Sequence, residues 1–363
     1  MTGAAAHLEA ALRVIAQAQQ IPGFQLTVVR ASGDVWGHSY GVTEASGASP
    51  VTSRTRFPLA SVTKVATALV IHSEVGAGRL SLASGLGALL PDVSWSDPRA
   101  KGVTLQQLLS HTAGLGDFDP IAWADDEATG DDALLNSVRL FAEQPLAGPP
   151  GEQYLYSNAG YDVAGLALAR AVGTSFEEAV ASTLLGPLGM TQSSFYPHAQ
   201  PLSPAAVGHV GDGLGGVVPY RGSIGSRSHA PCGTLACTGD DVARWMAALL
   251  NVDGELSRSF AGLTTPIAPT GRADGTVSCL GMRRRVRHGS FVFEHGGWDP
   301  GFRCALAVVP ERGIAACLLT NHHWSSPLMM ECCLDALQDR PVVVTEEVLK
   351  QLRVPPAAGR GAG

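Results

Sequence analysis

Apolar side chains gather in five short segments near the two ends of the chain. Two of them, FQLTVVR at 24–30 and the stretch 34–41, are joined by the turn residues Ala-Ser-Gly and are typical of paired strands. Three more, at 291–297, 302–310 and 313–321, are separated by short connections with glycine or proline, as in antiparallel hairpins. The pattern therefore predicts five strands that come from both ends of the sequence.

Helical spacing of apolar residues dominates most of the remaining chain. Near the N-terminus, Leu8, Leu12 and Ile15 recur at intervals that place them on one face of an amphipathic helix. Further helices are expected at 133–143, 159–172 and 326–337. Most of the chain between the two strand groups is therefore expected to be helical.

These elements predict an α/β protein of the α+β type. One antiparallel five-stranded sheet, built from both chain ends and flanked by helices, would carry an inserted, mostly helical lobe. We expect a single domain over residues 1–340, with the sheet lobe at about 1–60 and 230–340 and the helical lobe at about 61–229. Residues 341–363 are expected to form a C-terminal tail.

The charge of the chain narrows the choice of partners. Charged residues make up 16% of the sequence and the formal net charge is −7, which argues against nucleic acid or an anionic membrane as the main partner. No segment approaches the roughly 18 apolar residues that a membrane-spanning helix needs. The N-terminus lacks the pattern of a secretion signal, so we expect a cytoplasmic protein. The basic run at 283–287 is either a clamp for an anionic substrate or, the reading we favour, a solvated hairpin face.

The seven cysteines predict reduced structural thiols, because their number is odd and several lie in apolar segments. Cys232 and Cys237 have four residues between them, and neither a CxxC pair nor a spaced histidine supports a zinc site. We therefore expect no metal and no cofactor.

The stretch RFPLASVTKVATAL at 56–69 holds the first candidate for chemistry. Ser61 and Lys64 lie three positions apart where a helix begins, so the hydroxyl and the amine would share one face. Lysine can act as a base whereas arginine cannot, and the chain has only 3 lysines beside 22 arginines. A serine becomes a good nucleophile when such a base takes its proton, provided that burial and nearby positive charges lower the pKa of the lysine. The alternative is an ordinary helix-terminal serine beside a solvated lysine.

A second candidate lies in the stretch 150–161, where Tyr156 begins the only Y-x-N among the six tyrosines. A phenol beside a lysine can relay a proton, and the amide of Asn158 can hold the lysine and a substrate carbonyl together. The alternative is structural, because Ser157 and Asn158 also suit the start of the helix predicted next.

The third candidate is EHGGWDPGF at 294–302, at the end of a predicted strand. Gly296 and Gly297 would let the backbone approach a ligand closely, a strand edge could offer an N–H donor, and His295 adds a polar group. A glycine-rich bulge is the structural alternative.

Together, the three motifs resemble those of the serine β-lactamase-like superfamily, the penicillin-recognising enzymes. That family carries S-x-x-K, then Y-x-N, then K-T-G or H-x-G, in this order and at similar separations. The segments 108–115, 184–195 and 233–245 also resemble its class C-like branch, which includes esterases and DD-peptidases. The resemblance extends from about residue 22 to 340 and implies the β-lactamase/transpeptidase-like fold.

The resemblance also implies a role for each motif residue. Ser61 would be the acyl-accepting nucleophile, Lys64 its base and Tyr156 the proton relay. Asn158 would position the substrate and the lysine. The oxyanion hole would use the backbone N–H groups of Ser61 and Trp298.

His295 departs from the lysine of class C β-lactamases. It would line the substrate site with Gly296 and Gly297, and an uncharged histidine favours substrates without a carboxylate beside the scissile bond. The expected function is therefore that of a serine acyl-enzyme hydrolase of the esterase or amidase type, acting on a small-molecule or peptide-like acyl substrate. An acyltransferase or thioesterase-like cyclase of natural-product biosynthesis is the alternative. A β-lactamase, a D-amino-acid peptidase and a catalytically silent binding protein are less favoured.

Three other features carry weaker signals. Ser39 stands in a G-x-S-x-G match, but it ends a predicted hairpin where a nucleophile elbow needs a helix to follow. His111 is expected to be a structural histidine. The acidic stretch 116–132 is either a rim of the cleft or, slightly preferred, a solvated loop.

Overall fold

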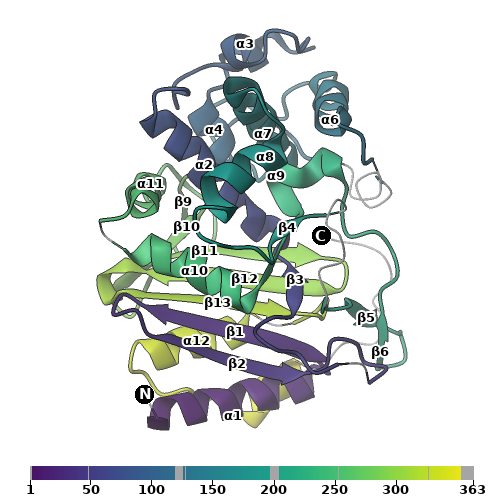
Figure 1. Ribbon diagram of the computed structural model, residues 1–363, viewed down its shortest axis with the longest axis vertical. Helices are drawn as coiled ribbons and strands as arrows, with labels where there is room; N and C mark the ends of the chain where they lie inside the picture. Colours follow the sequence, from purple (N-terminus) through teal and green to yellow (C-terminus); the bar gives the residue numbers. More distant parts are fainter. Residues whose placement is uncertain are drawn as a thin grey trace.

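The fold is built around one large antiparallel sheet whose strands come from both ends of the chain (Figure 1). The computed structural model describes residues 2–47, 49–118, 126, 128–196, 204–251, 253–325 and 327–352. The strand order is β2-β1-β13-β12-β11-β10-β9-β8. The strands are β1 (Gly23–Arg30), β2 (Val35–Gly41), β8 (Ala268–Pro269), β9 (Val277–Ser278), β10 (Arg283–Arg287), β11 (Ser290–Asp299), β12 (Phe302–Val309) and β13 (Ile314–Thr320).

The five predicted strands are all present and adjacent, in the order β2-β1-β13-β12-β11. The prediction of five strands was nevertheless too small, because β10, β9 and β8 extend the same sheet. The basic run is β10 itself, paired with β11 in a hairpin. Both β8 and β9 have only 2 residues, too few for an alternating pattern to reveal them.

Helices cover both faces of the sheet. On one face, α1 (Thr2–Ala18) and α12 (Leu328–Leu337) pack side by side, and α1 buries the three predicted residues Leu8, Leu12 and Ile15. On the opposite face, α10 (Gly239–Leu250) packs against β1 and β13. Figure 1 shows this layering, with the helical lobe above the sheet.

The inserted lobe is mostly helical, as predicted. Its longest helices are α2 (Thr63–Gly76), α6 (Ala133–Ala142) and α7 (Asn158–Val172). The shorter ones are α3 (Leu86–Leu89), α4 (Leu105–Leu109), α8 (Phe176–Val180), α9 (Ala230–Gly233) and α11 (Glu255–Leu263). Small strands join the lobe to the sheet: β3 (Arg56–Pro58) pairs with β7 (Leu235–Thr238), which pairs with β4 (Ser194–Phe195), while β5 (His209–Gly211) and β6 (Val217–Pro219) form a hairpin.

The C-terminal region is partly folded. Helix α13 (Glu346–Gln351) lies within the segment 341–363 that we predicted as a tail, and its Leu349 packs against the core beside α1. For these residues the prediction of a tail is therefore wrong, because the apolar side chain of Leu349 packs against the sheet lobe. The last residues, 353–363, lie outside the described part of the chain.

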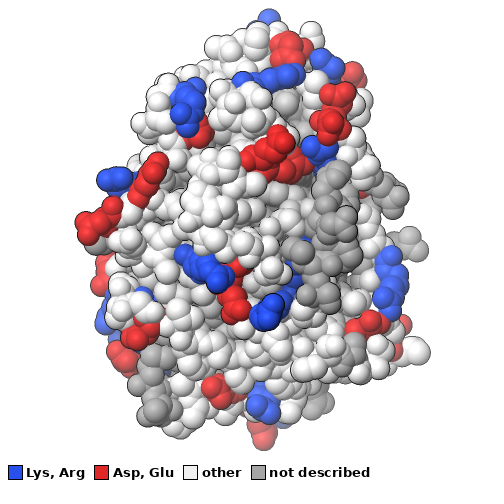
Figure 2. Space-filling view, in the orientation of Figure 1, with Lys and Arg blue, Asp and Glu red and all other residues white. Residues whose placement is uncertain are grey.

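The surface carries both signs of charge. On the face drawn in Figure 2, acidic and basic side chains are interspersed, and no extended area of one sign is seen among the described residues. Within the described residues, no helix combines the length and apolarity needed to cross a bilayer.

Candidate active site

Ser61 lies at the junction of the two lobes, in a 3₁₀ turn over Ala60–Val62 that leads directly into α2. The preceding residue, Ala60, has φ +44°, a left-handed conformation that is uncommon for a residue with a side chain. This turn is held between strands of both lobes, because Leu59 N donates to Leu235 O and β11 passes against its backbone. The serine is therefore presented on a fixed turn at the start of a helix.

Gly297 makes the close approach of β11 possible. A Cβ atom at this position would collide with Leu59 O and would lie 3.0 Å from the Cβ of Ala60. It would also collide with the sulfur of Cys304. Only glycine lets the strand come this close to the turn that carries Ser61.

Lys64 lies fully buried in the first turn of α2, and its ammonium group has three acceptors. Nζ donates to Ser61 Oγ at 3.2 Å, to Asn158 Oδ1 at 2.7 Å and to the carbonyl of Cys232 at 2.7 Å. Burial opposes its charge, but interactions with Tyr156 and Cys232 outweigh burial, and the pKa of Lys64 is raised above its ordinary value. A lowered pKa, the condition stated above for Lys64 to act as a base, is therefore not met in this state.

Tyr156 also contacts the serine oxygen. Its hydroxyl donates to Ser61 Oγ at 3.0 Å, and Lys64 Nζ lies 5.2 Å from the centre of its ring. The ring also lies 4.4 Å from that of His111, whose Nδ1 accepts from the Ser157 backbone at 3.2 Å. Burial and the charge of Lys64 hold the pKa of His111 well below its ordinary value, so this histidine is a neutral support for Tyr156.

Asn158 begins α7, and Ser157 caps the helix by accepting from Gly160 N, as its sequence suggested. The amide of Asn158 connects the lysine to an acid that the motifs did not predict. Its Oδ1 accepts from Lys64, while its Nδ2 donates to Asp117 Oδ2 at 2.9 Å. Asp117 comes from the acidic stretch, so part of that stretch does border the site; residues 119–125 and 127 lie outside the described chain.

Strand β11 supplies the wall opposite Tyr156. The ring of His295 lies 6.4 Å from that of Tyr156, and its Nδ1 lies 2.7 Å from the carbonyl of Gly296. Burial, together with the charges of Arg283 and Lys64, holds the pKa of His295 well below its ordinary value, so the ring is neutral at pH 7.

The end of β11 is open on one side. Strand β10 begins at Arg283, opposite Glu294, so beyond Glu294 the ladder pairs β11 with β12 alone. This leaves an edge near Trp298 at which a substrate carbonyl can meet a backbone N–H. Asp299 closes the strand in a buried position, and burial raises the pKa of its carboxyl group well above the ordinary value.

A cavity of about 760 Å³ opens over these residues. Its lining includes all the predicted site residues except the buried Lys64: Ser61, Tyr156, Asn158, His295, Gly296, Gly297 and Trp298. It also includes Asp117, Tyr154 and Arg283, which were not predicted as site residues. The basic run was the available signal for Arg283, and Arg285 of the same run lines the cavity as well.

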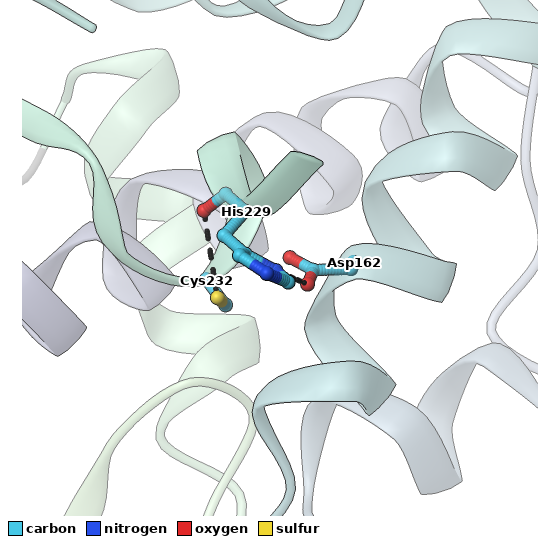
Figure 3. A group of neighbouring side chains, drawn as sticks. All are labelled: Asp162, His229 and Cys232. Carbon is cyan, nitrogen blue, oxygen red and sulfur yellow. Dashed lines mark hydrogen bonds and ion pairs between the residues drawn. The ribbon is translucent and has the colours of Figure 1, made fainter. Parts of the chain in front are cut away.

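A buried group below the lysine is the strongest candidate for a metal site among the described residues. Asp162, His229 and Cys232 offer ligand atoms within 4.8 Å of one another (Figure 3). However, His229 Nδ1 and Asp162 Oδ2 are 2.7 Å apart, a hydrogen-bond distance and closer than two ligands of a tetrahedral zinc ion at about 3.3 Å. The group acts as a hydrogen-bond network that ties α9 to α7, and α9 in turn presents the Cys232 carbonyl to Lys64.

The alternative nucleophile does not share this environment. Ser39 lies on β2 at the edge of the sheet, and its hydroxyl donates to the side chain of Gln25.

All seven cysteines are buried and unpaired.

Comparisons with known proteins agree with the geometry. A family model described as Beta-lactamase matches residues 8–327. Penicillin-binding protein 4 of Amycolatopsis lactamdurans is 28% identical over 333 residues, which cover 87% of this chain and 85% of that protein. Esterase EstB of Burkholderia gladioli is 30% identical over 202 residues, or 53% of this chain and 51% of EstB, so the match spans about half of each. A solved class C beta-lactamase shares the fold with a TM-score of 0.79 at 19% identity, covering 93% of this chain and 96% of that one.

Proposed function

Because the chain belongs to the beta-lactamase family, we propose that it is a serine hydrolase that cleaves an ester or amide through an acyl-enzyme on Ser61. One observation carries the proposal. Ser61 Oγ lies within hydrogen-bond distance of both an amine, Lys64 Nζ at 3.2 Å, and a phenol, Tyr156 at 3.0 Å, at the floor of an open cavity. A nucleophile in contact with both a base and an acid is what acyl transfer requires.

In acylation, Ser61 Oγ attacks the substrate carbonyl as its proton passes to the neutral form of Lys64. The backbone N–H groups of Ser61 and Trp298 stabilise the oxyanion. When the bond to the leaving group breaks, Tyr156 donates its proton to the departing alcohol or amine and is reprotonated from Lys64. Water then attacks the acyl-enzyme with the same proton transfers, which releases the acid and restores the serine.

The esterase or amidase reading is favoured over a β-lactamase by the third motif. His295 is neutral at pH 7, so it cannot replace the permanent charge of a lysine beside a carboxylate. The similarity to Esterase EstB supports the same choice. Arg283 places a different cation on the cavity wall.

Intact-protein mass spectrometry tests the proposal. The protein is exposed separately to p-nitrophenyl acetate, a D-peptide amide, a thioester and a penicillin. We expect the ester to add one acyl mass, mapped to Ser61 by peptide analysis, and the Ser61→Ala variant to add none. A stoichiometric adduct on another residue, or no adduct from any of the four compounds, would contradict the proposal.

A further inference from the structure

The cavity at Ser61 continues around the open end of β11 to the opposite face of the sheet. Side chains alternate along the strand: Phe293 packs into the core of the helical lobe, whereas Val292 packs into the core beside α12. Gly296 therefore faces α12. On that side the cavity is lined by Gly296, Arg303, Ala305, Leu318, Thr320 and Met330, which we call the rear compartment, and also by the ion-paired side chains of Arg285, Glu294 and Glu331.

Two small residues leave the rear compartment unfilled. Gly296 pairs directly with Ala305 across the ladder. A Cβ atom at Gly296 would meet nothing closer than 3.9 Å, the distance both to Arg283 and to the Cys304 carbonyl. Gly296 thus leaves a passage open between the space near His295 and the rear compartment. Gly297, by contrast, only permits close packing against the turn that carries Ser61.

The floor of the rear compartment is apolar. Leu318 and Met330 are almost completely buried on the α12 side, yet both border the cavity. The hydroxyl of Thr320 is hydrogen-bonded to that of Ser325 at 2.6 Å, so it does not need a hydrogen-bond partner from a ligand. This lining suits an aliphatic chain.

Arg303 gives the rear compartment a charge. Its Nε donates to the His323 carbonyl at 3.0 Å, and its guanidinium carbon lies 5.8 Å from the ring centre of Trp298. No carboxylate lies within 4 Å of this guanidinium in the described part of the chain, whereas Arg285 on β10 pairs with both Glu294 and Glu331. A partly buried cation without an acidic partner is stabilised by a bound anion.

The position of the proton donor indicates which part of the substrate, the acyl group or the leaving group, reaches the rear compartment. Tyr156 is the proposed proton donor to the leaving group, and its ring lies beside that of His295. A leaving group that takes its proton from Tyr156 departs into the space between Tyr156 and His295, from which the cavity continues past Gly296.

We propose that the rear compartment binds the leaving group of the substrate, an aliphatic chain that passes Gly296 and ends in a carboxylate at Arg303. This inference rests on the proposed acyl-enzyme function and specifies its substrate class. The preferred substrates are esters or amides whose alcohol or amine carries an acid at the end of a flexible chain.

Four acetate esters with the same acyl group test the inference. Their alcohols are ethanol, hexanol, 6-hydroxyhexanoate and 6-(trimethylammonio)hexanol, and kcat/KM is measured from acetate release. We expect the carboxylate ester to be cleaved faster than the hexyl ester, and at least about tenfold faster than the cationic ester, because a charge-assisted bond to arginine is gained or a repulsion is introduced. The hexyl ester should in turn exceed the ethyl ester.

Substitutions at two positions separate the effect of the charge of Arg303 from the effect of the volume of the rear compartment. Arg303→Gln should reduce the carboxylate-to-cation ratio to within about twofold of one, and Arg303→Lys should keep most of it. Ala305→Leu should lower the ratio of hexyl to ethyl ester at least about fivefold by filling the rear compartment. Thermal melts confirm that each variant is folded, and the ratios within one variant are insensitive to the amount of active protein.

The outcomes distinguish this inference from the proposed function. If p-nitrophenyl acetate acetylates Ser61 but the wild type shows no preference for chain length or charge, the rear compartment is not a substrate site. The same conclusion follows if Arg303→Gln keeps the wild-type charge ratio. If Ser61 is never acetylated, the proposed function fails and the inference fails with it.

Discussion

The hydroxyl of Tyr156 donates a 3.0 Å hydrogen bond to the side-chain oxygen of Ser61. These residues are almost one hundred positions apart, and the bond places an acid directly on the candidate nucleophile. Lys64 reaches the same oxygen from helix α2.

Replacing the nucleophile should abolish covalent labelling. Ser61→Ala should give no adduct with a fluorophosphonate probe and should lower kcat by a factor of about 10³ or more, as expected when the atom that forms the acyl bond is removed. Ser39→Ala is the matched control and should label like the wild type, since Ser39 lies on the sheet edge beside Gln25. Full labelling of Ser61→Ala would assign the nucleophile to another residue.

Lys64→Arg should be nearly as damaging as Lys64→Ala, although it keeps the charge. Arginine cannot become neutral and so cannot accept the serine proton. Because the pKa of Lys64 is raised, the neutral form is a minority at pH 7 and grows as the pH increases. The kcat/KM of the wild type should therefore rise with pH above 7. A variant Lys64→Arg that keeps more than about a tenth of the wild-type rate would assign lysine a purely electrostatic role.

Gly297→Ala should reduce kcat by a factor of about 10² or more, because the added methyl collides with Leu59 O and moves the strand that carries Trp298 N–H. Gly296→Ala is the matched control on the same strand. Its methyl would meet nothing closer than 3.9 Å, so its loss of kcat should be at least about tenfold smaller. Equal losses in the two variants would show that the close approach at Gly297 does not set the geometry of the site.

Arg283 should determine how well the enzyme accepts a carboxylate next to the scissile bond. The test compares kcat/KM for 3-carboxyphenyl butyrate with that for phenyl butyrate. Arg283→Gln should lower this ratio about tenfold by removing the cation from the cavity wall. His295→Lys should raise it, since the neutral imidazole is replaced by a charge. If neither substitution changes the ratio, the carboxylate is recognised elsewhere.

The buried carboxyl of Asp299 should make stability depend on pH. Its folded-state pKa is raised above the ordinary value of about 4, so above that pH the unfolded chain loses a proton that the folded protein keeps. Stability therefore falls as the pH rises toward the folded-state pKa. Asp299→Asn removes this loss, and its free energy of unfolding relative to the wild type should increase by up to about 1.4 kcal/mol per pH unit between pH 4 and 7. Urea unfolding at several pH values measures the difference, and a difference independent of pH would contradict the raised pKa.

The sequence could predict what depends on local spacing. Ser61 and Lys64 lie on one helical face because they are three residues apart, and the strands on either side of the site follow from alternating or continuous apolar runs. The contact of Tyr156 with Ser61 could be anticipated only through the family resemblance, since no local pattern brings distant residues together.

Other parts of the site depend on register and three-dimensional packing. Arg283, Arg285 and Arg287 alternate identically in the sequence, yet Arg285 and Arg287 form ion pairs with acids of α12. Arg283 and Arg285 both line the cavity, whereas Arg287 does not. The raised pKa of Lys64 also depends on packing, because Tyr156 and Cys232 are supplied by other elements.

The pairing of β1 with β13 sets the order in which the protein can mature during synthesis. The first strand leaves the ribosome early, but its neighbour in the sheet, Ile314–Thr320, is made much later. Strand β11 joins the N-terminal strands through β12 and β13, so His295 and Trp298 cannot be fixed opposite Ser61 until residue 320 has emerged. Closing such distant contacts is slow. A nascent or truncated chain that lacks β13 would therefore carry the serine and its lysine without the wall that completes the site, and the proposed hydrolysis would begin only after this strand has been made.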